Sequence, residues 1–208
     1  MMNKTLQWSI VTTTVALLCL LSYLFADIQT ALWFHTIDKT LFHKVFSKIT
    51  LFGDSLGYLV GGLLLFAFFR NWNSYWASLG LFLFSTVAIS GITADLVKYV
   101  AGRARPKLYF HEHLYGFDFF HWENAWTSFP SGHSATAMSV AILLAILYPR
   151  WRLVSLFWGL LIAFSRIVLA EHYISDVIAG SFLGIVSTLL LYKLYFKSKF
   201  EASEHNKI

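Results

Sequence analysis

Long apolar segments constrain the fold of this chain more than any other feature. A helix that crosses a bilayer needs about 20 mainly apolar residues, and Leu6–Ala26 forms such a segment without a single charge. Only 13% of the 208 residues are charged, whereas soluble domains carry roughly 25%. The sequence therefore predicts an integral membrane protein, with residues 1–208 forming one domain.

Six segments are expected to be transmembrane helices. They are Leu6–Ala26, Ile49–Phe69, Trp76–Ala94 with a continuation to Val100, His133–Tyr148, Leu153–Ala170 and Ser175–Phe196. The first follows Lys4, as in a signal peptide, but it exceeds the roughly 7–15 apolar residues of such a peptide and no clear cleavage site follows. We predict an all-α, polytopic membrane protein with six transmembrane helices and a solvated, irregular tail from Lys197 onward.

The basic residues of the loops predict the orientation. Six spans put both termini on one side, and with the termini inside, eight Lys and Arg residues fall on each side. The inside group is Lys4, Arg70, Arg150, Arg152, Lys193, Lys197, Lys199 and Lys207, and the outside group is Lys39, Lys44, Lys48, Lys98, Arg103, Arg105, Lys107 and Arg166. Setting aside Lys98, Arg105 and Arg166, which have a functional role below, leaves eight against five. Cytoplasmic termini are then expected, because basic loops stay inside.

Several classes of function are not expected. The net charge is +5, but the basic residues are spread between apolar segments and form no patch for nucleic acid. The single cysteine, Cys19, cannot form an internal disulfide. His111, Glu112 and His113 resemble part of a metal site, but no further ligand follows at a suitable spacing. No metal, other cofactor or oligomeric state is predicted.

Polar residues gather in three places along the membrane segments. Asp95, Lys98 and the sequence GRARP (102–106) end the third span, PSGH (130–133) begins the fourth, and SRIVLAEHYISD (165–176) joins the last two. Charged residues at membrane depth are costly and usually functional. In the expected topology all three clusters reach the outer face, so we expect them to form one site.

The combined cluster has the chemistry of an anion site. Helix starts offer unpaired backbone N–H groups and a positive dipole to phosphate, arginine adds planar bidentate donors, and glycine lets the backbone approach a ligand. The predicted phosphate-binding residues are Lys98, Arg105, Ser131, Gly132 and Arg166.

Two histidines predict the reaction. His172 and Asp176 are four residues apart and share a helix face. A carboxylate that fixes one ring nitrogen leaves the other free to act as a nucleophile. His133 lies in another segment and is suited to protonate the leaving oxygen. These roles predict phosphoryl transfer through a phosphohistidine. Arg103 and Lys107 flank the site and are expected to contact lipid headgroups, and Asp95 is one turn from Lys98 and placed to pair with it.

The spacing of these residues resembles a known family. This spacing is similar to the three-part signature of the type 2 phosphatidic acid phosphatase superfamily. The first part is Lys98 followed after six residues by Arg105-Pro106, and the second is Pro130-Ser131-Gly132-His133. The third is Ser165-Arg166, followed after five residues by His172 and after three more by Asp176. The match covers 98–176. The resemblance implies six membrane helices, metal-independent hydrolysis of phosphate esters at the outer face, His172 as nucleophile, Asp176 as its partner and His133 as acid.

We therefore expect a lipid phosphatase of a bacterial inner membrane, with cytoplasmic termini and a periplasmic active site. Expected substrates are undecaprenyl diphosphate, phosphatidylglycerophosphate, phosphatidic acid or lipid A 1-phosphate. Two alternatives remain: a lipid-to-lipid phosphotransferase, which shares the first half-reaction, and a non-catalytic lipid binder or scramblase, which needs no nucleophile.

Overall fold

The computed structural model describes residues 3–37 and 40–205, and within these ranges the regular structure is entirely helical. The helices are α1 (Lys4–Phe25), α2 (Asp27–Thr36), α3 (Leu41–Ile49), η1 (Thr50–Gly53), α4 (Ser55–Phe69), α5 (Ser74–Ala101), α6 (Pro106–Glu112), η2 (Asn124–Trp126), α7 (Gly132–Leu147), η3 (Pro149–Trp151), α8 (Arg152–Val168), α9 (Ile174–Leu191), η4 (Tyr192–Phe196) and α10 (Lys197–His205). Lys39 and Lys207, used in the charge count, lie outside the described residues.

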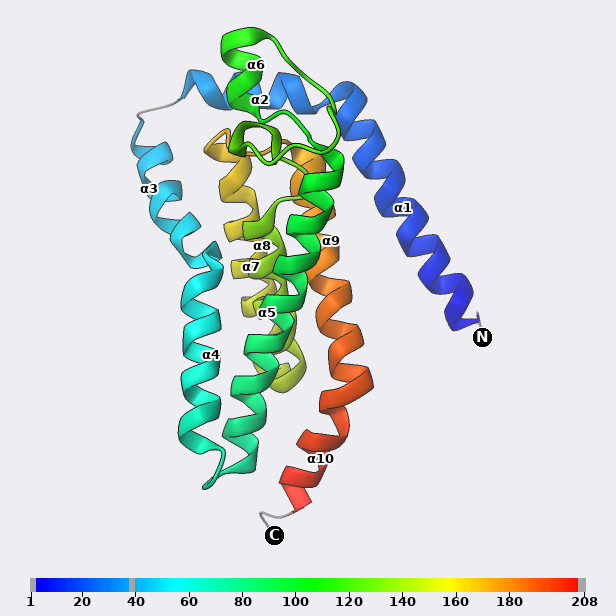
Figure 1. Cartoon of the computed structure of the whole chain (residues 1–208), viewed down its shortest axis with the longest axis vertical. Coiled ribbons are helices and arrows are strands. Elements are labelled where there is room, and N and C mark those ends of the chain that lie inside the picture. The colour runs from blue at the N-terminus through cyan, green and yellow to red at the C-terminus, as the bar shows by residue number, and fades with distance from the viewer. Residues whose placement is uncertain (1–2, 38–39, 206–208) are drawn as a thin grey trace.

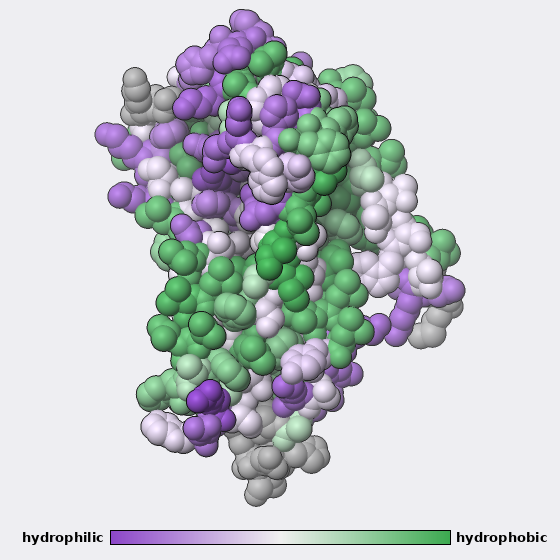
Figure 2. Space-filling view, in the orientation of Figure 1, coloured by the Kyte–Doolittle hydropathy of each residue, from purple (hydrophilic) through white to green (hydrophobic). Residues whose placement is uncertain are grey.

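The long helices run roughly side by side, and α1 leans away from them toward its N-terminus (Figure 1). Helices α2 and α6 cover the end of the bundle opposite the C-terminus. On the face shown in Figure 2, apolar side chains fill the middle of the molecule between more hydrophilic ends. This is the surface of a multi-pass membrane protein.

The expected spans correspond to six helical segments. Five are long and apolar enough to cross a membrane: Lys4–Phe25, Leu41–Phe69, Ser74–Ala101, Pro149–Val168 and Ile174–Ala202. The sixth, α7, is apolar but has 16 residues, which is about 24 Å of helix against a hydrocarbon core of about 30 Å. Its shortness places its N-terminus below the membrane surface if its C-terminus reaches the opposite face.

The second expected span, Ile49–Phe69, is confirmed as part of the apolar stretch Leu41–Phe69. This stretch is interrupted at Asp54, which is extended and whose side chain caps α4 by accepting from the Leu56 N–H at 2.8 Å. The connection between the first two expected spans contains the helices α2 and α3.

The tail from Lys197 is helical over its described part, which corrects the prediction of an irregular segment. Phe200 of α10 is only 5% exposed and joins a cluster with Phe82 and Phe196. One aromatic residue at the right helical position is enough to dock this polar helix against the bundle.

Small hydroxyl residues connect the helices inside the bundle. Thr86 of α5 and Thr188 of α9 share a hydrogen bond of 2.6 Å, and the Ser139 hydroxyl of α7 donates to that of Ser90 in α5 at 3.1 Å. All four side chains are fully buried. Small polar contacts of this kind hold membrane helices together, because lipid provides no hydrophobic drive between them.

The end of α5 directs the following segment back across the bundle. Gly102 adopts φ +56°, and a Cβ at this position would lie 1.7 Å from the Asp118 carbonyl oxygen. The Asp118 N–H donates to the Gly102 carbonyl at 2.8 Å, and the Ala104 N–H donates to that of Gly116 at 3.0 Å. Only glycine fits this left-handed, closely packed turn, which holds Arg103 and Arg105 at the covered end.

The start of α7 lies directly against α9. A Cβ on Gly180 would be 2.2 Å from the Ser131 carbonyl oxygen. The absence of a side chain at Gly180 lets the two backbones meet, and this contact sets the depth at which α7 begins.

Gly180→Ala should therefore destabilise the protein by about 1–3 kcal/mol, because the new methyl group has no room. Gly91→Ala in α5 is the matched control, since no atom lies within 4 Å of the added Cβ and alanine favours a helix by up to about 1 kcal/mol over glycine. Thermal unfolding in detergent measures both. Equal stability of the two variants would show that the α7–α9 contact is not tight.

Candidate functional site

The carboxylate of Asp176 lies at the centre of the covered end of the bundle and is fully buried. Its Oδ2 accepts from the Ser128 hydroxyl at 2.6 Å and from the Tyr173 N–H at 2.9 Å, and its Oδ1 forms a short ion pair with Arg103. Its backbone carbonyl accepts from the Ser131 N–H at 3.0 Å. Asp176 is also in the first turn of α9, where the helix dipole favours a negative charge.

His172 lies in the short link between α8 and α9 and is 3% exposed. Its Nδ1 faces Asp176 Oδ2 at 3.6 Å and the Ser128 hydroxyl at 3.5 Å. The separation from Asp176 is longer than a direct hydrogen bond, but catalytic pairs commonly tighten when substrate binds. Among the described residues, no partner is seen for Nε2. Burial of the ring, partly offset by Asp176, lowers the pKa of His172 to about 4.

The start of α7 brings PSGH to the same place. The Ser131 hydroxyl caps the helix by accepting from the Ser134 N–H at 3.4 Å, while the Ser131 N–H is used by Asp176. A Cβ on Gly132 would lie 3.1 Å from the Lys98 ammonium nitrogen, so this cation is next to the helix start. The first N–H groups of a helix have no intrahelical acceptor, which leaves those of Gly132 and His133 available to an anion beside this cation.

His133 packs against the turn before α4. A Cβ on Gly53 would be 2.9 Å from its ring carbon Cδ2. The ring is also within electrostatic range of Arg166 and His172. The two histidines predicted to act together therefore share one site, although they come from different helices.

Two arginines complete the cluster. Arg105 donates to the Glu171 carboxylate at 3.2 Å, and Arg166 lies 3.7 Å from the same oxygen while donating to the Thr50 hydroxyl at 2.9 Å. The Nε–H groups of both arginines are buried and lack a hydrogen-bond partner in the described part of the chain. The carboxylate of Glu171, which is 49% exposed, is an anion that both arginines already contact. The arginines are thus arranged to bind an oxyanion.

The structure brings all eight predicted site residues to one end of the bundle. The expected pairing of Lys98 with Asp95 is confirmed at 2.9 Å. Ser131 differs from expectation in its contacts, since its N–H donates to the Asp176 carbonyl across the α7–α9 junction and its hydroxyl accepts from Ser134 within α7. Among the described residues, no group of three or more His, Cys, Asp or Glu side chains is arranged to hold a metal ion.

The sequence did not lead us to three residues that lie behind His172, namely Arg103, Asp27 and Ser128. Arg103 was expected to touch lipid headgroups, yet it is 0% exposed and pairs with Asp27 at 2.7 Å as well as with Asp176. The position of Arg103 inside GRARP was the available signal. Asp27 and Ser128 carried none, because a single acid at the end of a span and a serine in a loop are common.

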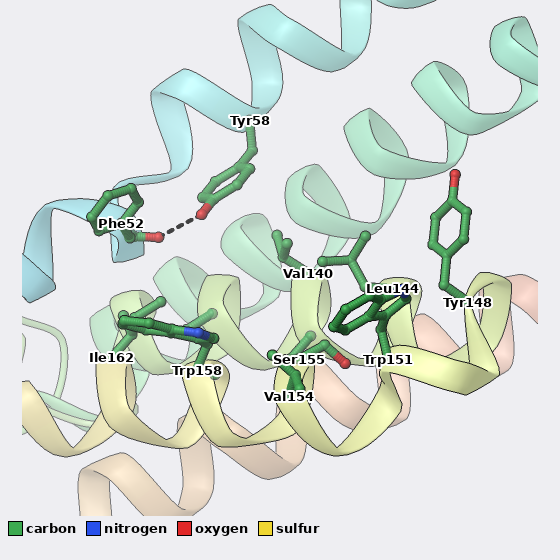
Figure 3. Close-up of a pocket in the computed structure, with 13 residues that line it drawn as sticks. Phe52, Tyr58, Val140, Leu144, Tyr148, Trp151, Val154, Ser155, Trp158 and Ile162 are labelled. Carbon is green, nitrogen blue, oxygen red and sulfur yellow. Dashed lines mark hydrogen bonds between the residues drawn. The ribbon is translucent and has the colours of Figure 1, made fainter.

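An apolar groove lies beside the site, between α4, α7 and α8 (Figure 3). It has a volume of about 580 Å³ and is lined at its site end by Phe52 and Ile162 and at its far end by Tyr148 and Trp151. The Tyr58 hydroxyl in its wall donates to the Phe52 carbonyl at 2.7 Å. Ile162 also lies against Gly53, the residue that contacts His133, so the groove begins next to the polar cluster.

Comparison with known proteins identifies relatives of this arrangement. The sequence pattern described as the PAP2 superfamily matches residues 79–200. A lipid A 1-phosphatase of Rhizobium johnstonii is 36% identical over 68% of this chain and 63% of its own length. A second lipid A 1-phosphatase, from Rhizobium etli, is 38% identical over 58% of this chain and 52% of its own length. The chain thus spans about half to two thirds of these relatives.

Two solved structures share the fold. The transmembrane PAP2-type phosphatidylglycerolphosphate phosphatase of Bacillus subtilis superposes with a TM-score of 0.66 at 21% identity, covering 89% of this chain and 96% of its own. LpxE of Aquifex aeolicus gives a TM-score of 0.60 at 19% identity, covering 80% and 94%. At these identities the likeness concerns the fold.

The low pKa of His172 gives a pH prediction. The ring should stay neutral from pH 7 to about pH 5, because its pKa in the folded protein is about 4 and that of a free histidine is about 6.5. Since the unfolded chain takes up this proton first, His172 contributes a loss of stability as the pH falls from about 6.5 toward 4. NMR of ¹⁵N-labelled histidines in micelles, with His172→Gln for assignment, measures the midpoint. A midpoint near 6.5 would contradict the burial argument.

Proposed function

The chain belongs to the PAP2 superfamily, and from this membership and the geometry above we propose that it is a membrane phosphatase that hydrolyses a lipid phosphate. The observation that carries the proposal is His172, whose Nδ1 faces Asp176 and whose Nε2 has no partner among the described residues, while Arg105 and Arg166 are near enough to disfavour a positive ring. Because two relatives are named lipid A 1-phosphatases, lipid A 1-phosphate is the first candidate substrate.

The phosphate binds among fixed positive groups. Lys98, Arg105 and Arg166 surround the site, and the N–H groups of Gly132 and His133 point out of the α7 N-terminus. The buried Nε–H donors of the two arginines support this assignment, since an oxyanion satisfies them. Ser131 contributes by holding the helix start against Asp176. Glu171 occupies Nη1 of Arg105, so a phosphate that binds this guanidinium through both Nε and an Nη group competes with the Glu171 carboxylate.

In the first half-reaction, the Nε2 lone pair of His172 attacks phosphorus. The bond between phosphorus and the lipid oxygen breaks, and this oxygen takes a proton from His133. The His172 ring keeps its Nδ1 proton and becomes a positively charged phosphoimidazole, which Asp176 stabilises. The surrounding cations stabilise the charge on the transferred oxygens.

In the second half-reaction, water attacks the phosphohistidine. His133, neutral after giving up its proton, takes a proton from the water as the new P–O bond forms. The P–N bond breaks, the electron pair returns to His172 Nε2, and inorganic phosphate leaves. His133 ends protonated, so the cycle closes.

The apolar groove supports a lipid as the substrate. It runs along α7 from Ala137 to Tyr148, which is roughly 16 Å at 1.5 Å per residue. Its site end lies beside His133, so an acyl chain in the groove leaves the headgroup phosphate among the cations. The short α7 further supports lateral entry, because its start lies below the membrane surface.

We also propose a bacterial inner-membrane location with cytoplasmic termini and a periplasmic site. The site lies at the end opposite the C-terminus, and α1 runs away from that end toward the N-terminus (Figure 1). Arg103 is buried as well, so it no longer counts as a loop charge. The basic residues are then eight inside against four outside, which supports this orientation.

The purified protein should release phosphate from lipid A 1-phosphate in detergent, and EDTA should leave the rate unchanged because fixed cations of the chain hold the phosphate. His172→Ala should lower turnover by at least about 10³-fold, as loss of a nucleophile does. Parallel assays with phosphatidylglycerophosphate, phosphatidic acid and undecaprenyl diphosphate define the preferred lipid. His43→Ala in α3 serves as control. Full loss of activity in EDTA with recovery by a divalent ion, or normal turnover by His172→Ala, would contradict the mechanism.

A further inference from the structure

Asp27 connects the first membrane helix to the site. It follows the end of α1, is 1% exposed, and lies outside the segment 79–200 that matches the family pattern. Its carboxylate pairs with Arg103 Nη2 at 2.7 Å and accepts from the Ser175 N–H at 3.1 Å and from the Ser175 hydroxyl at shorter range. Asp27 is the first residue of α2 and Ser175 is the immediate neighbour of Asp176, so the junction between α1 and α2 is fastened directly behind the nucleophile.

One guanidinium joins the two carboxylates. Arg103 Nη2 binds Asp27, while Nη1 binds Asp176 and donates to the Ser175 hydroxyl at 2.6 Å. The guanidinium carbon lies 4.7 Å from the ring centre of Tyr173 and 5.1 Å from that of Tyr23. Burial disfavours the charge, but Asp176 and Asp27 outweigh it and raise the pKa of Arg103. Arg103 is therefore a permanent cation.

The charges of Asp27, Arg103 and Asp176 do not cancel. Asp27 and Asp176 carry two negative charges and Arg103 carries one positive charge, which leaves one negative charge in excess. If Asp176 and Arg103 were alone, they would neutralise each other behind His172. Arg105 and Arg166 face the ring from the substrate side and disfavour a positive imidazole. The excess negative charge is the feature that opposes them.

The proposed reaction makes the His172 ring positive, because the ring keeps its Nδ1 proton while Nε2 bonds to phosphorus. A fixed negative charge near a group that becomes positive lowers the barrier most when water is excluded. Asp27, Arg103 and Asp176 are all buried, so their arrangement needs no solvent reorganisation during the step.

We propose that Asp27 is a positioning residue for phosphoryl transfer: through Arg103 it fixes Asp176 against His172 and supplies the excess negative charge that favours the phosphoimidazole. This inference rests on the proposed phosphatase function. It assigns the junction between α1 and α2 a part in the site, although this junction lies outside the three-part signature.

The test compares Asp27→Asn with Asp118→Asn. Asparagine keeps the size and the acceptor oxygen of Asp27 but removes its charge. The side chain of Asp118 is 64% exposed, and its carboxylate pairs with His121 at 2.8 Å. Single-turnover formation of the phosphoenzyme should slow about 10–100-fold in Asp27→Asn, the usual effect of removing a carboxylate that orients a functional histidine. The Michaelis constant for the lipid and inhibition by vanadate should change less than about twofold, and Asp118→Asn should match the wild type.

A double variant separates charge from packing. Asp27→Asn with Arg103→Gln again leaves one negative charge, that of Asp176. The inference predicts a double variant at least as fast as Asp27→Asn alone, because the double variant restores the excess negative charge of the wild type. If only packing mattered, the restored charge would recover nothing, and a double variant tenfold slower than Asp27→Asn would overturn the inference.

The remaining outcomes are also decisive. An unchanged single-turnover rate in Asp27→Asn overturns the inference. Failure of both Asp27→Asn and the double variant to fold also overturns it, because Asp27 and Arg103 would then be needed for folding. Absence of phosphatase activity in the wild type is a different result, because it overturns the proposed function itself.

Discussion

The buried ion pair between Arg103 and Asp176 is the interaction on which the site depends. Asp176 also accepts from the Ser128 hydroxyl and, through its backbone, from the Ser131 N–H. One residue thus joins the segment after α5, the start of α7 and the start of α9. A buried charge with a single partner is costly, but here every carboxylate oxygen has a donor. The network fixes His172 because the carboxylate beside it cannot turn.

Much of this architecture could be predicted from local patterns. Apolar runs located the membrane helices, and the spacing of His172 and Asp176 predicted that the two side chains are neighbours. The expected shared helix face is wrong, because His172 lies in the non-helical link before α9 and only Asp176 is helical. The Asp95–Lys98 pair followed from a separation of one helical turn. In each case the interacting residues are near in sequence, or the chemistry of a motif specifies the neighbour that it needs.

The parts that could not be predicted depend on contacts between distant segments. Asp27 and Ser175 are separated by 148 positions, and no periodicity connects them. Arg103 looked like a surface cation because its two acidic partners lie on other helices. Phe200 shows the same limit, since a polar tail gave no sign that one aromatic side chain docks it. Which side chains of a loop or tail point inward depends on the distant segments that pack against it.

The central claim is that the reaction passes through a covalent phosphate on His172. Rapid acid-free quench of the purified protein with phosphorus-labelled lipid A 1-phosphate, followed by proteolysis and mass spectrometry, tests it most directly. The account predicts one acid-labile, base-stable phosphoryl group on the peptide that contains His172, formed at least as fast as the enzyme turns over. A phosphoryl group on another residue, or turnover without any covalent phosphate, would contradict it.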